Sequence, residues 1–485
     1  MDVLNKLVLS PFEWSMSNQI SASPMEVFVR LDCVGFVDET KFTDAILAEL
    51  KLQPLLQANA TIGPTHLKSH WRPASNCVPD IRWFAGDPDD DSGLPSDFAP
   101  IDLENEIGFR FYGWRFLVDD QQRVVMKFVY HHACCDGKSG VEFAEKTFQR
   151  YQCLLAEEAA ALDDKLTVAD EDRLRNRARL TAKKLSPIDR IWRALVVRPK
   201  RIGSMLLSKP RVFSKPTENA NGGVCDVFSE LPQLCTTQFS RDQTRQLGVL
   251  SRKRSASTNT ILASELFHVL NDHFESNETS ATEVKRNKRN LCILIPFSLR
   301  DQGYQSMPVA NCVSMAYLAA SRKILKADRP DDLVLVADLA RQVKFIRRWN
   351  LQYSWIESIN TYVRIWPIFR LLKYVRKGRS MQIAPTTVMT NLGRAMSDSD
   401  LATNSDGEIT VNGSGPKGFV VKSVHVSPPC TATVIVNFSI NFYSDRLTLD
   451  VTYLPSFLDG ETAEGLLGSW RQRVIDSVAG LPTEG

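Results

Sequence analysis

Residues 124–155 constrain the fold most, because they predict a strand, a tight turn and a helix in immediate succession. Residues 124–130 are β-branched, aromatic and apolar, which is typical of a half-buried strand. Two histidines, His131 and His132, close this run, and apolar residues then recur at helical spacing over 141–155. The segment therefore predicts an α/β architecture in which two imidazoles lie where a strand meets a turn.

The tandem histidines are candidates for acid–base chemistry. Side chains alternate along a strand, so His131 and His132 are expected to point to opposite faces, one packing and the other reaching a cavity. Near neutral pH a histidine has a large unprotonated fraction, which makes it a natural general base for an alcohol or amine.

The Asp136-Gly137 pair that follows predicts a structural turn. A buried Asp136 would need a cationic partner, since an isolated buried charge is costly. Gly137 lets backbone or a thin ligand approach closely because it carries no side chain.

Two other chemistries are available in principle to His131, His132, Cys134, Cys135 and Asp136. Adjacent residues on a strand diverge, and the chain has no Cys-x-x-Cys pair or His-x-x-x-His helix to complete a metal site. A thiolate beside an imidazolium would be an activated nucleophile. Buried cysteines that pack as small hydrophobes are commoner. We therefore expect no metal and no cysteine nucleophile.

The order His-His-x-x-x-Asp-Gly at residues 131–137 resembles the signature of an acyltransferase superfamily. This superfamily includes chloramphenicol acetyltransferase, nonribosomal peptide synthetase condensation domains, polyketide-associated acyltransferases, wax ester synthase/diacylglycerol acyltransferases and alcohol acetyltransferases. Further segments that resemble it follow in family order over nearly the whole chain: Gln53-Pro54-Leu55-Leu56, 257–263, Ile295-Pro296-Phe297-Ser298-Leu299-Arg300, 307–311, Thr390-Asn391-Leu392-Gly393 and 439–459.

The chain also departs from the family pattern. Gln53 replaces a usual histidine, and Thr260 stands where wax ester synthases have aspartate. The Asp-Phe-Gly-Trp-Gly segment of plant-type acyl-CoA acyltransferases is absent. The resemblance is therefore to the superfamily rather than to either of these subgroups.

The resemblance implies an α/β (α+β) fold of two chloramphenicol-acetyltransferase-like lobes, each a mixed β-sheet flanked by helices, with an active-site tunnel between them. It places an N-terminal lobe at 1–180, a basic crossover linker at 181–224 and a C-terminal lobe at 225–485.

The resemblance also assigns roles. It implies that His132 is the general base and that no metal or bound cofactor is needed, with acyl-CoA or an acyl-phosphopantetheine as co-substrate. Residues expected to support the site are His131, Asp136, Gly137 and Arg300, with Arg300 the partner of Asp136. Thr390 and Asn391 are tunnel or oxyanion candidates, and capping or turn roles remain open for both.

The implied function is transfer of an acyl group from a coenzyme A or carrier-protein thioester to a hydroxyl acceptor, a hydrophobic alcohol or a lipid. Two alternatives stay open: a condensation-type enzyme that forms an amide, and a non-catalytic module that binds a carrier protein or a lipid. Acyl length, acceptor and oligomeric state are not specified by the sequence.

Two basic, aromatic segments, 173–215 and 344–379, predict a further surface role. The first holds fourteen Lys and Arg side chains against the single acid Asp189, with Trp192 and several aliphatic residues among them. Such segments are typical of docking on an anionic membrane surface. A solvated helix face and a cradle for coenzyme A phosphates are the other interpretations.

Composition sets the outer limits. The chain has 485 residues, 43% hydrophobic and 24% charged, enough for more than one core. Its ten cysteines lack framework spacing, and the first ten residues lack a secretion leader. We therefore expect a cytoplasmic protein that associates peripherally with a membrane. A net charge of +3 gives no argument for nucleic acid.

Overall fold

The structure is a computed structural model of the whole chain. The residues it describes are 7–17, 24–74, 78–88, 94–156, 168–178, 185–197, 199, 210–213, 231–277, 290–300, 308–327, 333–354, 356–357, 385–396, 401–411, 418–431 and 434–479.

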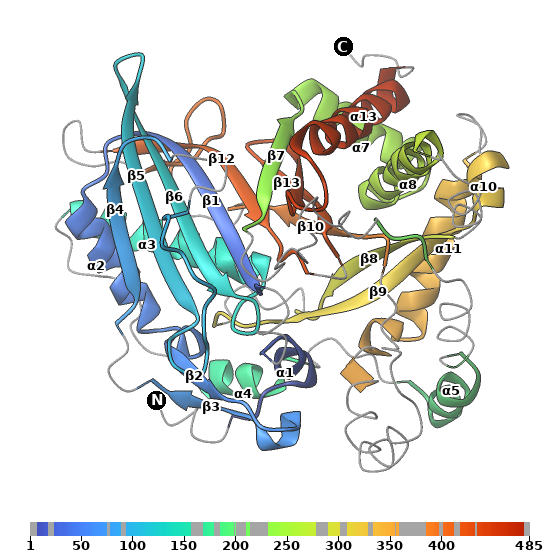
Figure 1. Cartoon of the computed structure of the whole chain (residues 1–485), viewed down its shortest axis with the longest axis horizontal. Coiled ribbons are helices and arrows are strands. Elements are labelled where there is room, and N and C mark those ends of the chain that lie inside the picture. Colours follow the sequence, from blue (N-terminus) through green and yellow to red (C-terminus); the bar gives the residue numbers. More distant parts are fainter. Residues whose placement is uncertain are drawn as a thin grey trace, which may run out of the picture.

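Two six-stranded sheets form the two lobes, and Figure 1 shows them side by side with their helices on the outside. The first has the order β11-β12-β1-β6-β5-β4 and is mixed, because β4 and β5 run parallel while the other neighbours are antiparallel. Its strands are β1 (Glu26–Gly35), β4 (Asp80–Ala85), β5 (Phe109–Val118), β6 (Gln121–His131), β11 (Thr410–Val411) and β12 (Phe419–Ser427). A short ribbon of β2 (Ala58–Thr61) and β3 (His70–Pro73) lies below it.

Helices α2 (Glu39–Leu50) and α3 (Gly137–Leu155) cover one face of the first sheet. Phe42 of α2 is fully buried at the centre of this core. Its ring centroid lies 5.6 Å from that of Phe111 on β5, 5.2 Å from that of Tyr151 on α3 and 6.5 Å from that of Phe419 on β12. Aromatic packing of this kind fixes α3, and with it the turn that carries His132.

The second sheet has the order β7-β14-β13-β10-β8-β9 and is also mixed, since β10 runs parallel to both β13 and β8. Its strands are β7 (Gln233–Gln238), β8 (Leu291–Ser298), β9 (Val313–Ala320), β10 (Thr387–Arg394), β13 (Val436–Tyr443) and β14 (Arg446–Tyr453). The helices packed with it are α7 (Arg241–Lys253), α8 (Thr258–Ser276), α10 (Arg322–Ala327), α11 (Val334–Arg348) and α13 (Gly460–Ala479).

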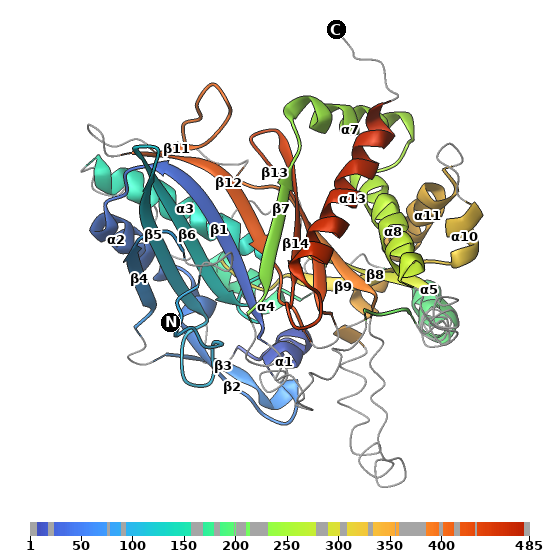
Figure 2. The same cartoon turned by 45° about the horizontal axis from the view of Figure 1, so that its top comes forward.

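Helices α13 and α8 lie side by side in the turned view of Figure 2. Trp470 of α13 joins these two helices to the sheet. Its ring meets Phe438 of β13 edge-on at 5.4 Å, and its Nε1 donates to the Leu262 carbonyl of α8 at 3.0 Å. The even-numbered residues of β13 thus pack against helices, and its odd-numbered residues face the first lobe.

Strands β11 and β12 cross from the second half of the chain into the first sheet. The sequence places residues 410–427 in the C-terminal lobe, but β12 pairs with β1 from Phe28–Ser427 to Gly35–Phe419. The boundary predicted at 225–485 is therefore corrected for these two strands. The physical reason is that β1 has a free edge, which β12 covers and so removes as an unpaired strand.

The sequence prediction of two mixed α/β lobes is confirmed. Three shorter helices, α1 (Pro11–Ser17), α4 (Val168–Asn176) and α5 (Pro187–Trp192), lie near the lower edge of the molecule in Figure 1. Most of the predicted linker at 181–224 lies outside the described residues. Among the helices that are described, none is long and apolar enough to cross a membrane.

Candidate active site

The backbone around His132 is held on both sides. Its N–H donates to the Met25 carbonyl at 2.7 Å, which continues the β1–β6 pairing by one step. The turn closes with the Cys134 N–H donating to the His131 carbonyl at 2.9 Å. Asp136 then caps α3 by accepting from the Ser139 N–H at 2.9 Å, a role for which aspartate is favoured.

The His132 ring is buried and neutral. Its Nδ1 lies 3.0 Å from the Cys135 carbonyl oxygen, which can only accept, so Nδ1 carries the proton. The other nitrogen, Nε2, is left as an acceptor. Burial lowers the pKa of His132 below its usual value, and the Cys135 carbonyl and Asp136 offset this only in part. The side chain therefore has the protonation state that a general base requires.

His131 is a packing residue. It is 1% exposed, and its Nδ1 accepts from the Ala133 N–H at 3.2 Å. Burial, helped by His132, lowers its pKa to about 3. The two histidines therefore divide as alternation along the strand predicts, with His132 lining the cavity described below.

Asp136 and Arg300 form a buried ion pair between the lobes. Their side chains are 1% and 5% exposed, and Arg300 Nη2 lies 2.8 Å from Asp136 Oδ2. Asp136 Oδ2 also accepts from the Cys312 N–H at 2.8 Å, and Arg300 Nη2 donates to the Ala310 carbonyl at 3.1 Å. Every oxygen of this carboxylate is engaged, so its geometry is that of a structural support.

Gly137 is required by close approach of the second lobe. A Cβ at this position would lie 2.8 Å from Leu392 Cδ2 on β10 and 3.1 Å from Val426 Cγ1 on β12. Both distances are shorter than ordinary carbon–carbon contact. A side chain here would push β10 away from the His132 turn.

A cavity of about 630 Å³ contains His132, Asp136, Gly137 and Arg300 and is bounded by both lobes. The first lobe contributes Phe12, Met16, Met25 and Val27; the second contributes Leu294, Val313, Tyr317, Val388, Thr390, Asn391 and Leu392; Val426, Pro428 and Pro429 come from β12 and its end. Most of these side chains are apolar, as in sites for small hydrophobic ligands.

Thr390 and Asn391 lie on this cavity wall, as the sequence suggests. Asn391 is already engaged, because its Nδ2 contacts Asn259 Oδ1 and its Oδ1 accepts from the Gly393 N–H at 2.6 Å. Asn391 therefore links α8 to the irregular end of β10, where the pairing with β13 shifts register.

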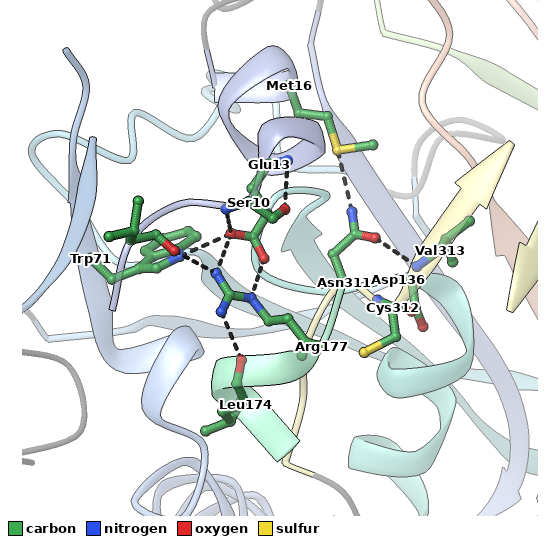
Figure 3. A network of polar contacts seen from close by, with 12 residues as sticks. Ser10, Glu13, Met16, Trp71, Asp136, Leu174, Arg177, Asn311, Cys312 and Val313 are labelled. Carbon is green, nitrogen blue, oxygen red and sulfur yellow. Dashed lines mark hydrogen bonds and ion pairs between the residues drawn. The ribbon is translucent and has the colours of Figure 1, made fainter. Parts of the chain in front are cut away.

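Asn311 is a supporting residue that the sequence analysis did not single out. Its Nδ2 donates to the His132 carbonyl at 2.6 Å. Figure 3 shows its other two contacts: Nδ2 lies 3.3 Å from Met16 Sδ, and Oδ1 accepts from the Val313 N–H at 3.2 Å. Its place in the 307–311 segment that resembles the family was the available signal. Asn311 thus connects β9, the His132 turn and helix α1.

Helix α1, which carries the cavity residues Phe12 and Met16, is fixed by a second buried ion pair (Figure 3). Glu13 is 0% and Arg177 is 3% exposed, and Arg177 Nη2 donates to Glu13 Oε2 at 2.6 Å. Trp71 Nε1 donates to the same carboxylate at 3.2 Å. The cavity wall on this side therefore depends on a residue just before the predicted linker.

This geometry corrects part of the membrane-surface prediction. Arg177 and Arg193 are two of the cations of 173–215 that the sequence places on this surface. Arg177 is buried against Glu13, and Arg193 pairs with Glu357 at 2.9 Å with its side chain 13% exposed. Neither is available to lipid headgroups. Most of the second basic segment, from residue 358 onward, lies outside the described residues.

Cys134 and Cys135 are fully buried, and burial raises the pKa of both thiols well above its usual value. Neither is a thiolate at neutral pH. Within the ranges that the structure describes, no three His, Cys, Asp or Glu side chains are grouped as metal ligands would be.

The fold and the inter-lobe cavity define a two-lobed α/β protein with the architecture shared by condensation domains and acyltransferases. Among solved structures, the chain is similar to the trichothecene 15-O-acetyltransferase TRI3 of Fusarium sporotrichioides, with TM-score 0.63, 11% identity, and 97% of this chain and 94% of that chain covered. It is also similar to the epimerization domain of the third module of tyrocidine synthetase B, with TM-score 0.61, 12% identity, and coverage of 98% and 96%.

A third similar structure is polyketide synthase associated protein 5 of Mycobacterium tuberculosis, with TM-score 0.56, 14% identity, and 98% of this chain and 99% of that chain covered. No protein-family model and no curated protein sequence matches the chain. At these identities the likeness establishes the fold, and the chemistry has to be argued from the site.

Proposed function

We propose that the chain is an acyltransferase that moves an acyl group from a thioester to a hydroxyl acceptor. The observation that carries the proposal is His132, whose unprotonated Nε2 is available in a mostly apolar cavity between the lobes. An acetyltransferase with the same fold supports it.

The proposed reaction needs one base and no covalent acyl-enzyme. His132 Nε2 takes the proton of the acceptor hydroxyl as its oxygen bonds to the thioester carbonyl carbon. The tetrahedral intermediate then collapses, the C–S bond breaks, and the imidazolium returns the proton to the leaving thiolate. Positioned base catalysis contributes about 10²- to 10⁴-fold. Holding both substrates in one cavity supplies further rate. Thr390 is the remaining oxyanion candidate.

The thioester donor is coenzyme A or the phosphopantetheine of a carrier protein. Condensation domains with this fold support the carrier-protein option. The apolar lining favours a hydrophobic alcohol or a lipid as acceptor.

An amide-forming condensation reaction is the second candidate, because the same base serves an amine acceptor and condensation domains are among the similar structures. A non-catalytic module that binds a carrier protein or a lipid is the third. The Nδ1 atom and the backbone carbonyl of His132 are both held by hydrogen bonds, which favours an intact catalytic site over a decayed one.

We also propose peripheral association with an anionic membrane through α5 and the turn after it. Ile188, Ile191, Trp192 and Leu195 are 79%, 61%, 54% and 72% exposed, and the exposed Arg190 lies among them. Apolar side chains beside cations suit the membrane interface.

The test is thiol release from short and long acyl-CoAs, and from an acyl carrier protein, with alcohols, diacylglycerol and amines as acceptors. Acceptor-dependent release that is lost in His132→Ala supports acyl transfer, and the productive acceptor separates ester from amide formation. Absence of release from every pair, with folded protein that still binds a donor, would favour the binding module.

A further inference from the structure

Asn437 places an amide group in the apolar part of the cavity. It lies on β13, opposite Val388 of β10, and both side chains line the cavity. Leu294, Tyr317 and Val434 line the same region. Asn437 is 1% exposed, so its polar atoms are almost entirely withdrawn from solvent.

The orientation of this amide is fixed by its neighbours. Asn437 Nδ2 lies 3.1 Å from the Pro429 carbonyl oxygen and 3.3 Å from Cys430 Sγ. A carbonyl only accepts, so the NH₂ group must face it. The amide oxygen therefore points elsewhere, and it accepts no hydrogen bond from any part of the chain that the structure describes.

A buried carbonyl without a donor is unfavourable, which makes this oxygen a candidate for ligand recognition. Ser439 Oγ, Asn441 Oδ1 and Thr452 Oγ1 also have no partner among the described residues. Ser439 and Asn441 lie further along β13, and Thr452 lies opposite Asn437 on β14. None of the three is part of the cavity lining. Of these four residues, only Asn437 belongs to the lining of the cavity.

The distance between Asn437 and the histidines can be derived from the strand pairing of the first sheet. His131 pairs with Glu26 on β1, and β1 pairs on its other side with β12, where Phe28 lies opposite Ser427. Pro429 comes two residues after Ser427, so it lies on the order of 10 Å from the histidines, which is two strand spacings. Asn437 is hydrogen-bonded to the Pro429 carbonyl. It is therefore far enough from His132 to contact a part of the substrate that does not react.

We propose that the Asn437 amide oxygen accepts a hydrogen bond from a hydroxyl or amide N–H carried partway along the substrate chain. The enzyme then selects chains with one polar donor in an otherwise apolar stretch, on either the acyl group or the acceptor. This inference rests on the proposed acyl transfer. A site built to receive a donor rejects the analogue that lacks it, because the buried oxygen is then left without a partner.

The experiment compares matched substrates that differ by one hydroxyl. One arm uses acyl-CoAs in which a hydroxyl is moved along the acyl chain, and the other uses diols against mono-alcohols as acceptors. We expect kcat/KM to rise about tenfold or more at one hydroxyl position in one arm. Asn437→Leu abolishes that preference, whereas the control Val388→Ala enlarges the same wall and keeps it.

A binding measurement separates this inference from the proposed reaction. Calorimetric titration of His132→Ala with non-reactive thioether analogues, hydroxylated and plain, reports recognition without turnover. Selective binding without turnover in the parent would contradict acyl transfer and still support Asn437. Equal kcat/KM and equal binding for both members of every pair, in the parent itself, would overturn the inference and leave a bound water as the partner of this oxygen.

Discussion

Arg300 of the second lobe donates to Asp136 of the first lobe at 2.8 Å. Asp136 lies four residues after His132. Asp136 also begins helix α3 by accepting from Ser139. One carboxylate therefore joins the helix that follows the base to the opposite wall of the cavity. The turn that holds His132 is specified by contacts from both lobes.

Breaking the Asp136–Arg300 ion pair is expected to lower the stability of the protein more than it lowers the activity of the molecules that remain folded. Arg300→Met leaves Asp136 buried without its cation, which costs about 3–5 kcal/mol in the free energy of unfolding. Asp136→Asn combined with Arg300→Met removes the charge and keeps a residue that caps helices well. Urea denaturation should show the double variant more stable than Arg300→Met. Normal stability with lost activity in the single variant would instead place Arg300 in the chemistry.

Removing the base is expected to abolish turnover in a folded protein. His132→Ala should lower kcat by about 10²- to 10⁴-fold, measured as acceptor-dependent thiol release. His131→Asn is the matched control, because asparagine can still accept from the Ala133 N–H. Comparable activity in folded His132→Ala and parent would refute the assignment.

The pH dependence should report the environment of His132. Burial lowers its pKa below 6.5, so the neutral base persists into mildly acidic solution. We expect kcat/KM to be flat above pH 6.5 and to fall, by about tenfold per pH unit, only below the lowered pKa. Initial rates from pH 4.5 to 8, with circular dichroism to confirm folding, provide the test. A fall in kcat/KM with a midpoint above pH 6.5 would contradict the assignment of a buried, neutral imidazole to His132.

Ser423, His425 and Asp450 have the spacing of a serine hydrolase triad. His425 Nε2 lies 3.0 Å from Ser423 Oγ, and Nδ1 lies 3.1 Å from Asp450 Oδ1. Although burial lowers the pKa of His425, Asp450 and Asp32 together raise it to about 10. The ring is therefore an imidazolium that cannot take a proton from serine. It acts as a cation between Asp32 of the first sheet and Asp450 of the second.

Loss of this cation is expected to weaken the contact between the lobes. His425→Asn leaves the fully buried Asp450 without a cationic partner and should lower the free energy of unfolding by about 3–5 kcal/mol. The raised pKa means that this stabilisation is complete below about pH 6.5 and is lost as pH rises toward 10. Urea melts at pH 6 and pH 9 should therefore differ less in His425→Asn than in the parent. An equal difference in both proteins would exclude this role.

The exposed apolar side chains of α5 predict binding to anionic lipid vesicles. Trp192→Ser should weaken binding to phosphatidylserine vesicles by about tenfold or more, since a large apolar side chain no longer enters the interface. Leu117→Ser is the control, because Leu117 is 73% exposed on the far hairpin of the first lobe. Co-sedimentation at low and high salt gives the measurement. Equal losses in the two variants, or equal binding to neutral vesicles, would contradict specific docking.

The sequence was informative where function is encoded locally. His132, Asp136 and Gly137 lie within one turn, and the helical and strand periods around them fix both neighbouring elements. Arg300 could be paired with Asp136 only through resemblance, because nothing local links the two residues.

The remaining features depend on contacts between distant segments. Asn311 is one polar residue after a proline-containing loop, and its bond to the His132 carbonyl exists only once β9 approaches the turn. From the sequence, Arg177 looks like one more surface cation, because its partner Glu13 lies far away in the chain, on α1. In the same way, a single histidine on β12 gives no sign that Asp32 and Asp450 will enclose it.

The crossing of β12 has a consequence for synthesis of the chain. Val29 on β1 pairs with Val426 on β12, so the first sheet lacks two of its strands, β11 and β12, until residues 410–427 have left the ribosome. The first lobe is thus completed only after most of the second lobe has been made, and the exposed edge of β1 must be protected in the meantime. A single cut between the two lobes would leave β12 on a different fragment from β1, its partner in the first sheet.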